Sequence, residues 1–491
     1  MKKPGRPWKI IARATAAGVL MACLTNASWG QLGGLPANLP GKIPGGLPGG
    51  VAGGVPGAIP AGVPAGLPSG TPAGTLGGAL SSPLGGSVPV GPVLQNVPQT
   101  VTKTVNGVDQ TLQSTINTTQ TTIDTVKRDI VGRPLLTAAL ARDPQGARIV
   151  RGEILAVSPS TTSLAAVKRL NFGIERTETL SSLGLTAVVL SVPNGMNTSD
   201  ALAALKKADP QGTYDYNHIY DPSGAMTPHI GGGVAMPVVH VSAIRIGMID
   251  GGVVQQHPAF SDATIIAKDI AGEHHAPPTA HGTAVASLLV GDDGDFHGYL
   301  PGATLYVADA FGGEATGGSA IDLVRALNWL ASQRVAVVNA SLAGPPNALL
   351  QAGVRAFLAG GHVLVAAVGN NGPAAPLAYP ASYPGVIAVT SVDRNRRLQV
   401  DANRGDVTFA AIGVDVRTAA LRGYTNDTGT SFATPVVAAR FALLIPAPNS
   451  QTAERARLAL ERVALPMGKG PGDPAFGYGY LPPPSLALAR R

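Results

Sequence analysis

Hydrophobic residues after position 241 occur in short unbroken runs that alternate with segments of helical spacing. The runs are rich in Val, Ile, Leu and Ala and cover residues 244–249, 303–310, 335–338, 362–368 and 386–392. Between them, residues 319–333 and 347–358 place apolar side chains three and four positions apart, as one face of a helix requires. Continuous apolar strands that alternate with helices predict a buried parallel sheet covered on both faces, an α/β domain.

A smaller unit is predicted upstream of this domain. Residues 147–157, 187–192 and 212–222 are predicted as strands, and residues 162–170 and 197–208 as helices. The second helix opens with residue types that favour helix caps. A folding unit of this size has a core that is marginal on its own.

Residues 96–133 are predicted as an amphipathic helix. Apolar residues recur every three to four positions between Val101 and Ile130, with a phase shift near Ile116. The many threonines in this segment weaken the helix. It either lies on the neighbouring domain, which we favour, or mediates oligomerisation.

Glycine and proline dominate residues 31–95. Many of the 63 glycines and 42 prolines of the chain lie here, and between residues 36 and 72 proline recurs at intervals of four. Proline removes a backbone donor and glycine adds backbone entropy, so neither helix nor sheet can propagate. We predict a disordered spacer, a passive tether in preference to a self-associating or wall-contacting segment.

The first thirty residues have the layout of a secretory signal peptide. Five basic residues and no acid precede an apolar run at residues 14–24, and small residues follow at 27–30. Five of the seven net positive charges therefore lie in this leader, and the charge of the chain is no argument for nucleic-acid binding. We predict export to the extracellular space or to a bacterial cell envelope.

Cys23 is the only cysteine and lies inside the predicted leader. The exported chain would therefore have no disulfide and no cysteine metal site. The residues before Cys23 also resemble a bacterial lipoprotein processing box, in which the cysteine carries lipid. Membrane attachment is expected only in that case.

Two polar residues, an aspartate and a histidine, lie at the ends of apolar segments that are predicted as a strand and a helix. Asp250 ends the apolar strand at 244–249, where a carboxylate is costly to bury unless a polar group receives it. His281 begins a helical run, where the positive end of the helix dipole keeps an imidazole neutral unless a carboxylate is near. Gly282 is expected to leave room for a substrate. Taken singly, each residue is more often structural.

Two further segments carry candidate chemistry. Ser431 lies in the string Gly-Thr-Ser-Phe-Ala-Thr-Pro at 429–435, at the start of a helix that has Pro435 in its predicted first turn. An ordinary N-cap does not explain the small residues that keep this hydroxyl approachable. Asn370 follows the strand at 362–368, and its amide is a fixed donor able to hold a developing oxyanion.

Together these segments resemble the four signature blocks of the subtilisin-like serine peptidases, the subtilases of peptidase family S8. The blocks are Asp250-Gly251-Gly252, His281-Gly282-Thr283, Gly369-Asn370 and residues 429–435. The order of Asp, His and Ser is that of subtilisin itself. The resemblance implies a subtilisin-like three-layer α/β sandwich with a mostly parallel sheet over residues 240–491.

The resemblance also implies roles for residues outside the four blocks. Ser341, Leu342, Ala343 and Gly344 correspond to the substrate-binding strand of the family. Residues 134–225 resemble its propeptide, a small α+β ferredoxin-like domain that serves as intramolecular chaperone and inhibitor.

The chain departs from the family pattern at several positions, none of which removes a reacting group. Gly251 stands where Ser or Thr is usual after the catalytic Asp, Ala284 replaces a common His, and Phe432 replaces the usual Met. The loop Asp292-Asp293-Gly294-Asp295 lies where many relatives bind calcium, without their ligand pattern. No cofactor is expected for the chemistry and no metal in the site, and structural calcium stays open.

The function implied is a secreted serine endopeptidase that acts on protein or peptide substrates. Ser431 is the nucleophile, His281 the base, Asp250 its orienting carboxylate and Asn370 an oxyanion donor. The precursor is expected to cut itself between about residues 220 and 241, and its propeptide is the expected inhibitor.

Two other interpretations of the function remain open. One is a catalytically silent subtilase fold that serves as a surface binding or structural module. The other is an acidic-site relative with Glu in place of His, against which His281 argues.

Overall fold

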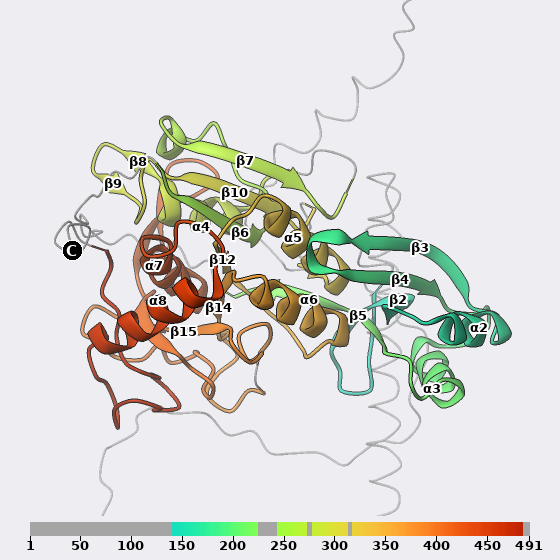
Figure 1. Cartoon of the computed structure of the whole chain (residues 1–491). Helices are drawn as coiled ribbons and strands as arrows, with labels where there is room; N and C mark the ends of the chain where they lie inside the picture. The colour runs from blue at the N-terminus through green and yellow to red at the C-terminus, as the bar shows by residue number, and fades with distance from the viewer. Residues whose placement is uncertain (1–139, 224–242, 273–276, 313–316, 377, 485–491) are drawn as a thin grey trace, which may run out of the picture. The chain divides into compact units, whose positions relative to one another are not determined.

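The computed structural model describes residues 140–223, 243–272, 277–312, 317–376 and 378–484, drawn in colour in Figure 1. The predicted leader at 1–30, spacer at 31–95 and helix at 96–133 lie outside the described residues. Within the parts of the chain that the structure describes, no helix combines the length and the apolar character needed to cross a bilayer.

A seven-stranded sheet, parallel throughout, forms the centre of residues 243–484, which we call the large domain. In spatial order it consists of β16 (Phe409–Ile412), β15 (Ile387–Val392), β14 (Val363–Ala367), β12 (Val337–Ala340), β6 (Arg245–Asp250), β10 (Thr304–Asp309) and β7 (Thr264–Asp269). The five inner strands are those that the apolar runs predicted. The edge strands β7 and β16 were not predicted; no residue of β7 is buried, and its sequence mixes apolar with polar residues.

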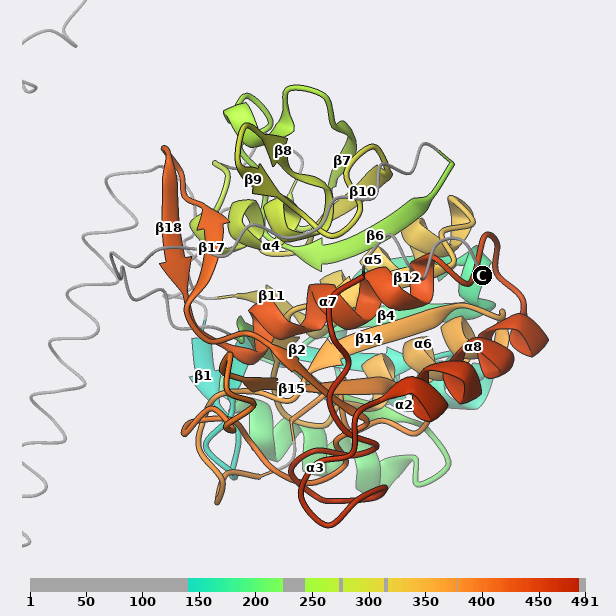
Figure 2. The same ribbon diagram turned by 90° about the vertical axis from the view of Figure 1, so that its left-hand side faces the viewer.

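Helices cover both faces of this sheet, as the alternation predicted. One face packs on α4 (Ala280–Val290), α7 (Thr430–Ala442) and α8 (Ser450–Val463), the other on α5 (Ala320–Ser332) and α6 (Ala348–Ala359). Successive strand residues divide between the two cores, so that Met248 faces α4 and α7 whereas Ile249 faces α5 and α6. Figure 2 shows α7, buried along its whole length, lying across the sheet. The three-layer α/β sandwich is thereby confirmed.

Residues 140–222 form a second unit, the small domain. Its elements are β1 (Leu140–Arg142), β2 (Arg148–Val157), α2 (Thr161–Arg169), β3 (Gly173–Leu180), β4 (Leu185–Ser191), α3 (Thr198–Ala208) and β5 (Tyr214–Pro222). Four of its strands pair antiparallel in the order β5-β2-β4-β3, and β1 adds to β2. This βαββαβ order is the ferredoxin-like arrangement. The strand β3 was not predicted, because seven of its eight residues are at least partly exposed and most are polar.

The small domain is sandwiched between its own helices and those of the large domain. Ile154 and Leu190 pack with α2 and α3, whereas Leu155 and Val189, on the opposite face of the same sheet, join the core of α5 and α6. In Figure 1 the helices α5 and α6 accordingly lie between the two sheets. The marginal core of this unit is thus extended by burial against the large domain.

Strand β5 continues beyond its own sheet into the large domain. Its residues Ile219 and Tyr220 pair antiparallel with β11 (Gly318–Ser319), and Asp221 and Pro222 pair with β13 (Leu342–Ala343). Backbone hydrogen bonds therefore join the two domains on both sides of one strand.

Glycine at position 282 is required by helix packing, which corrects the expectation that it leaves room for a substrate. A Cβ atom there would lie 2.4 Å from the carbonyl oxygen of Gly251 and 2.8 Å from that of Gly252. These carbonyls belong to the turn that follows β6, so the absence of a side chain lets the first turn of α4 rest directly on that turn.

We predict that Gly282→Ala lowers the free energy of unfolding by about 1–3 kcal/mol, because the methyl group would collide with rigid backbone. Urea unfolding of the Ser431→Ala chain would measure the change. Gly353→Ala in α6 is the matched control, since a Cβ there would meet only the side chain of Val324, at 2.9 Å. Equal losses in the two variants would contradict the role of the carbonyl contacts.

Asp309 is a buried carboxyl group at the end of β10, directly opposite Asp250 in the parallel ladder. Its Oδ1 accepts hydrogen bonds from the backbone N–H groups of Phe311 and Gly312, at 3.1 and 3.0 Å. Burial nevertheless raises the pKa of Asp309 to about 6, and the negative charges of Asp269 and Asp250 add to this effect.

Because the folded-state pKa is raised, Asp309 favours the folded chain most below about pH 4, and this contribution is lost as the pH rises to about 6. We expect Asp309→Asn to remove this loss, so that the stability difference between variant and parent grows by up to about 3 kcal/mol between pH 4 and pH 7. Urea unfolding at each pH measures it, with Asp262→Asn at an exposed carboxylate as control. A constant difference across this range would refute the assignment.

Candidate active site

Asp250 and His281 form a buried pair at the carboxyl edge of the sheet. Asp250 is the last residue of β6, and both of its carboxylate oxygens lie 3.0 Å from Nδ1 of His281. The backbone N–H of Gly251 donates a third hydrogen bond to Oδ1, at 2.8 Å. Asp250 is therefore the carboxylate beside this histidine. Its hydrogen bonds orient the imidazole so that Nδ1 is the donor.

Local sequence explains why His281 stands at this position. It is the second residue of α4, whose first turn is capped by Thr279 through a 3.0 Å hydrogen bond from the N–H of Gly282. A side chain on Gly251 would collide with that same threonine, so glycine after Asp250 makes room for the cap. The ring centroid of Phe432 lies 5.7 Å from that of His281, which adds an apolar contact to the imidazole.

The second nitrogen of the imidazole is free of protein partners. Nε2 of His281 is buried and accepts no hydrogen bond from the described residues. With Nδ1 as the donor toward Asp250, Nε2 is the ring nitrogen left with a lone pair in the matching tautomer. A buried base with one unused lone pair can take a proton from a nearby hydroxyl.

Ser431 is the second residue of α7 and is fully buried. The N-cap of this helix is Gly429, so the serine hydroxyl is not a cap. Its Oγ donates to the carbonyl oxygen of Ser341 at 3.1 Å, and its backbone N–H donates to the carbonyl oxygen of Ser223 at 2.9 Å. The hydroxyl is therefore held against the residue that precedes β13, and no hydrogen bond joins it to His281 among the described residues.

Pro435 has a different role from the one predicted. It is the sixth residue of α7, not part of the first turn, and its missing N–H leaves the carbonyl oxygen of Ser431 without a helical partner. The hydroxyl of Ser341 donates to this oxygen at 2.9 Å. The proline thereby creates the acceptor that connects α7 to the strand Ser341–Gly344.

Asn370 follows β14 and is fixed by its side-chain oxygen. This Oδ1 accepts hydrogen bonds from the N–H of Thr430 and from the side-chain amide of Gln399, both at 3.0 Å. Two donors on one atom identify it as the oxygen, which leaves Nδ2 as a buried donor that has no acceptor among the described residues. Thr430 directly precedes Ser431, so the hydrogen bond from the N–H of Thr430 links the side chain of Asn370 to the helix that carries the serine.

Residues 219–223 lie between β11 and β13 as a central strand. The N–H of Ser223 donates to the carbonyl oxygen of Ser341 at 3.0 Å, which continues the pairing of β5 with β13 by one residue. The carbonyl carbon of Ser223 thus carries an oxygen that is held by the N–H of Ser431. Addition of a strand in this way is one of the modes by which proteins bind extended peptides.

Sequence reasoning missed this arrangement. It predicted the strand at 212–222 as the last strand of the small domain, without a partner in the large domain, and it placed Ser319 only at the start of a helix, with no strand at Gly318–Ser319. A Gly-Ser pair carries no strand pattern, so nothing in that segment could have identified an edge of the cleft.

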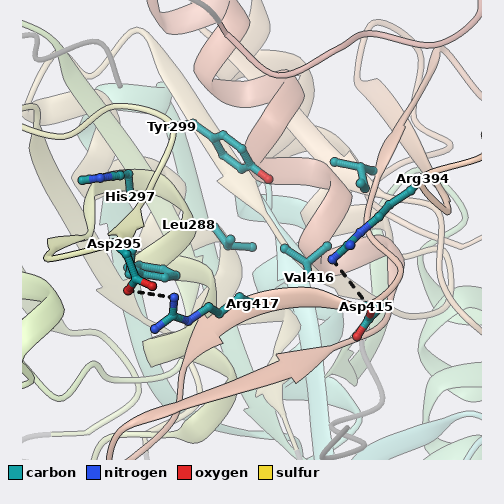
Figure 3. Close-up of a pocket in the computed structure, with 10 residues that line it drawn as sticks. Leu288, Asp295, His297, Tyr299, Arg394, Asp415, Val416 and Arg417 are labelled. Atoms are coloured by element: carbon teal, nitrogen blue, oxygen red, sulfur yellow. Dashed lines mark hydrogen bonds and ion pairs between the residues drawn. The ribbon is translucent and has the colours of Figure 1, made fainter. Parts of the chain in front are cut away.

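The acidic loop at 292–295 turns its carboxylates toward protein groups. Asp292 contacts His297, Asp293 accepts from the hydroxyl of Tyr424, and Asp295 pairs with Arg417 at 2.9 Å. Figure 3 shows the last pair beside a second one, between Arg394 and Asp415. Among the described residues no group of three His, Cys, Asp or Glu side chains is arranged to hold a metal ion. Structural calcium at this loop was left open by the sequence and stays untested, and an ion would have to compete with these partners.

Comparison with known proteins gives this geometry a context. The model of the Subtilase family matches residues 242–480. Subtilisin DY of Bacillus licheniformis is 32% identical over 248 residues, which cover 48% of this chain and 87% of subtilisin DY. The minor extracellular protease Epr of Bacillus subtilis is 30% identical over 243 residues, and there the chain spans only 37% of the relative's length.

A solved structure extends the likeness of fold. Fervidolysin from Fervidobacterium pennivorans, described as a keratinolytic enzyme related to subtilisin, matches with a TM-score of 0.57 and 21% identity. The match covers 70% of this chain and 61% of fervidolysin, so it reaches beyond residues 242–480. The resemblance predicted from the four sequence blocks is confirmed: this chain belongs to the subtilase family of serine-type endopeptidases.

Proposed function

We propose that the chain is an exported endopeptidase precursor that cuts its own backbone after Ser223. One observation carries the proposal: the carbonyl oxygen of Ser223 accepts a hydrogen bond from the N–H of Ser431, at 2.9 Å, while the strand that precedes it is paired on both sides. The small domain is then the propeptide, and the large domain is the peptidase. The new position falls within the range expected from the sequence.

The reaction uses four groups of this chain. The hydroxyl of Ser431 leaves the carbonyl of Ser341 by rotation about χ1 and gives its proton to Nε2 of His281 as Oγ attacks the substrate carbonyl carbon. Asp250 stabilises the imidazolium that forms. The oxyanion receives hydrogen bonds from the N–H of Ser431 and from Nδ2 of Asn370. The N–H of Ser431 donates to the carbonyl oxygen of Ser223, and Nδ2 of Asn370 has no acceptor among the described residues.

The second half of the reaction returns the enzyme to its starting state. His281 gives the proton to the leaving amine as the peptide bond breaks, which leaves an acyl group on Ser431. Water then gives a proton to His281 as its oxygen attacks the acyl carbon. His281 passes that proton to Oγ of Ser431 as the bond between Oγ and the acyl carbon breaks, which releases the new carboxyl terminus and restores the serine hydroxyl. No step draws on a cofactor.

The small domain has the contacts of an inhibitor that stays bound after cleavage. Besides the two strand pairings, the carboxylate of Asp215 accepts a 2.7 Å hydrogen bond from the N–H of Ala348 at the start of α6. The side chain of Asn347 donates to the carbonyl oxygen of Tyr216 at 2.8 Å. A carboxylate at a helix N-terminus is favourable, so this contact adds to the affinity. Export with the cleft occupied would keep the peptidase silent until the propeptide is removed.

A silent surface module remains the second candidate, because one observation favours it. The hydroxyl of Ser431 is bonded to Ser341 and not to His281, and the cleft is closed by the chain's own strand. A serine-directed phosphonate separates the two candidates: it labels Ser431 of an active peptidase once residues 140–223 have been released, and it labels no serine of a silent one.

We predict that the exported wild-type chain acquires a new N-terminus at Gly224, whereas Ser431→Ala stays uncut, because the nucleophile is absent. Intact mass and N-terminal sequencing of both proteins measure this, with Ser382→Ala as a control serine outside the site. A wild-type chain cut only upstream of Leu140 would contradict the proposed bond. Cleavage of the Ser431→Ala chain at the same bond would refute the nucleophile.

We predict that Asn370→Ala lowers kcat of the processed enzyme by about 10²–10³ with little change in KM, a range already known for such a donor in subtilisin itself. The reason is that Nδ2 has an acceptor only when an oxyanion forms. Steady-state kinetics on a peptide anilide checks it, and Gln399→Ala, which removes only one support of Asn370, should cost less. A loss confined to KM would contradict the assigned role.

A further inference from the structure

Asn339 is a fully buried polar residue of β12 to which the reaction above gives no role. It pairs in the ladder with Met248, which faces α4 and α7, and residues that are paired across a sheet share a face. The helix α7, which carries Ser431, packs against β12 on this face (Figure 2). An amide in such a place loses its contacts with water and has to be hydrogen-bonded by protein groups.

The side-chain amide of Asn339 begins a chain of two hydrogen bonds that ends at Ser431. Its Nδ2 donates to Oγ of Ser341 at 3.0 Å, and this hydroxyl donates to the carbonyl oxygen of Ser431 at 2.9 Å. A hydroxyl has one proton, which is used here on the carbonyl, so Oγ can only accept from Asn339. The atom that faces Ser341 is therefore Nδ2. We call these two hydrogen bonds the Asn339 relay.

The relay ends on the acceptor that Pro435 creates. In a regular helix the N–H of residue 435 would donate to the carbonyl oxygen of residue 431, and proline has no N–H. The hydroxyl of Ser341 takes the place of that donor. Linked hydrogen bonds polarise one another, so the amide of Asn339 strengthens the bond that the hydroxyl donates. The backbone of the nucleophile is thus held from β12 and not only from its own helix.

Stability of the fold does not account for Asn339. Its Oδ1 is buried and accepts no hydrogen bond from the described residues. A buried acceptor without a donor costs free energy, whereas an apolar side chain of similar shape is often neutral or stabilising at such a place. Leucine would therefore serve the fold at least equally well, which points to a role for the amide in the reaction.

We propose that Asn339 is a positioning residue of the peptidase, which acts through the hydroxyl of Ser341 on the backbone of Ser431. The inference deepens the proposed function and rests on it, since it concerns the same nucleophile. The carbonyl oxygen of Ser341 receives the N–H of Ser223, so this one residue holds both the peptide and the helix of the nucleophile. The relay thereby sets the distance between Ser431 and the carbonyl that it attacks.

Loss of the relay is expected to change kcat and not KM. A misplacement of about 1 Å at the reacting atoms costs up to about 10² in rate. The main-chain pairing that binds the peptide does not involve the side chains of Asn339 and Ser341, so binding is retained.

The first test compares activity with stability in Asn339→Leu. On a peptide anilide, kcat of the processed enzyme should fall by about tenfold with little change in KM. Urea unfolding of the same substitution in the Ser431→Ala chain should show no loss of stability, because the unpartnered Oδ1 is removed. Parallel losses of kcat and of stability would make the residue merely structural and would overturn the proposal.

Thr390→Val is the matched control for this test. Thr390 is also fully buried, in the strand β15 (Ile387–Val392), and its Oγ1 likewise has no partner among the described residues. The substitution therefore removes a comparable polar atom that is not part of the relay. It should leave kcat unchanged, and a loss equal to that of Asn339→Leu would contradict the specific role of the relay.

The second test asks whether Asn339 acts through Ser341. Ser341→Ala removes the donor to the carbonyl oxygen of Ser431, so it should lower kcat at least as far as Asn339→Leu. Adding Asn339→Leu to Ser341→Ala should then cause no further loss, because the relay is already broken. A further loss of about tenfold in the double variant would show that Asn339 acts by another route, which would overturn the relay.

The third test supplies the missing donor from the helix and is read without activity. In Pro435→Ala the N–H of residue 435 can donate to the carbonyl oxygen of residue 431. In the Ser431→Ala chain, Ser341→Ala should lower the urea midpoint of unfolding when residue 435 is proline, and should lower it less when residue 435 is alanine. Equal shifts in the two backgrounds would contradict the replacement of a helical bond by the hydroxyl of Ser341.

Failure of this inference is distinguishable from failure of the proposed function. A wild-type chain that stays uncut, or a Ser431→Ala chain that is cut after Ser223, refutes the proposed function. A wild-type chain that processes itself, together with an Asn339→Leu enzyme of undiminished kcat, overturns the role of Asn339 and leaves the proposed function standing.

Discussion

Hydrogen bonding at Ser341 connects the helix that carries Ser431 with the end of the small domain. Its carbonyl oxygen receives both the hydroxyl of Ser431 and the N–H of Ser223, and its own hydroxyl donates to the carbonyl oxygen of Ser431. That last acceptor exists because Pro435 cannot complete the helix. A buried backbone group must find a partner, so the missing proline N–H is what ties the helix of the nucleophile to the strand that holds the peptide.

The carboxyl edge of the parallel sheet concentrates acidic groups in a buried place. Asp250 is compensated by three hydrogen bonds and becomes the partner of His281. Asp309 lies next to it in the ladder, and its pKa is raised. Burial also raises the pKa of Asp427, which lies outside this sheet and four residues before Ser431, although the hydrogen bond from the hydroxyl of Thr418 partly offsets this. Burial therefore disfavours negative charge at Asp309 and at Asp427, whereas the carboxylate of Asp250 is held by hydrogen bonds from Gly251 and His281.

One strand gives the small domain two structural functions. Within its own sheet β5 pairs with β2, and its last residues pair with β11 and β13 of the large domain. The small domain, whose core is limited, gains stability from burial against α5 and α6. The large domain in turn has its cleft filled by main-chain hydrogen bonds. Folding and inhibition are then consequences of the same interface, which supports the proposed role of this unit as a propeptide.

The sequence by itself determined the layered α/β sandwich, the family and the residue types of the site, because apolar strands and short signature blocks are local patterns. Local patterns did not determine the exposed strands β3 and β7, the backbone contacts that require glycine at 282, or the acceptor that Pro435 creates. Only the tertiary structure decided that Ser223 meets Ser431, which lies 208 positions further along the chain. The contact is a hydrogen bond between backbone groups, and backbone groups are the same whatever the side chain, so the sequence carries no local signal for it.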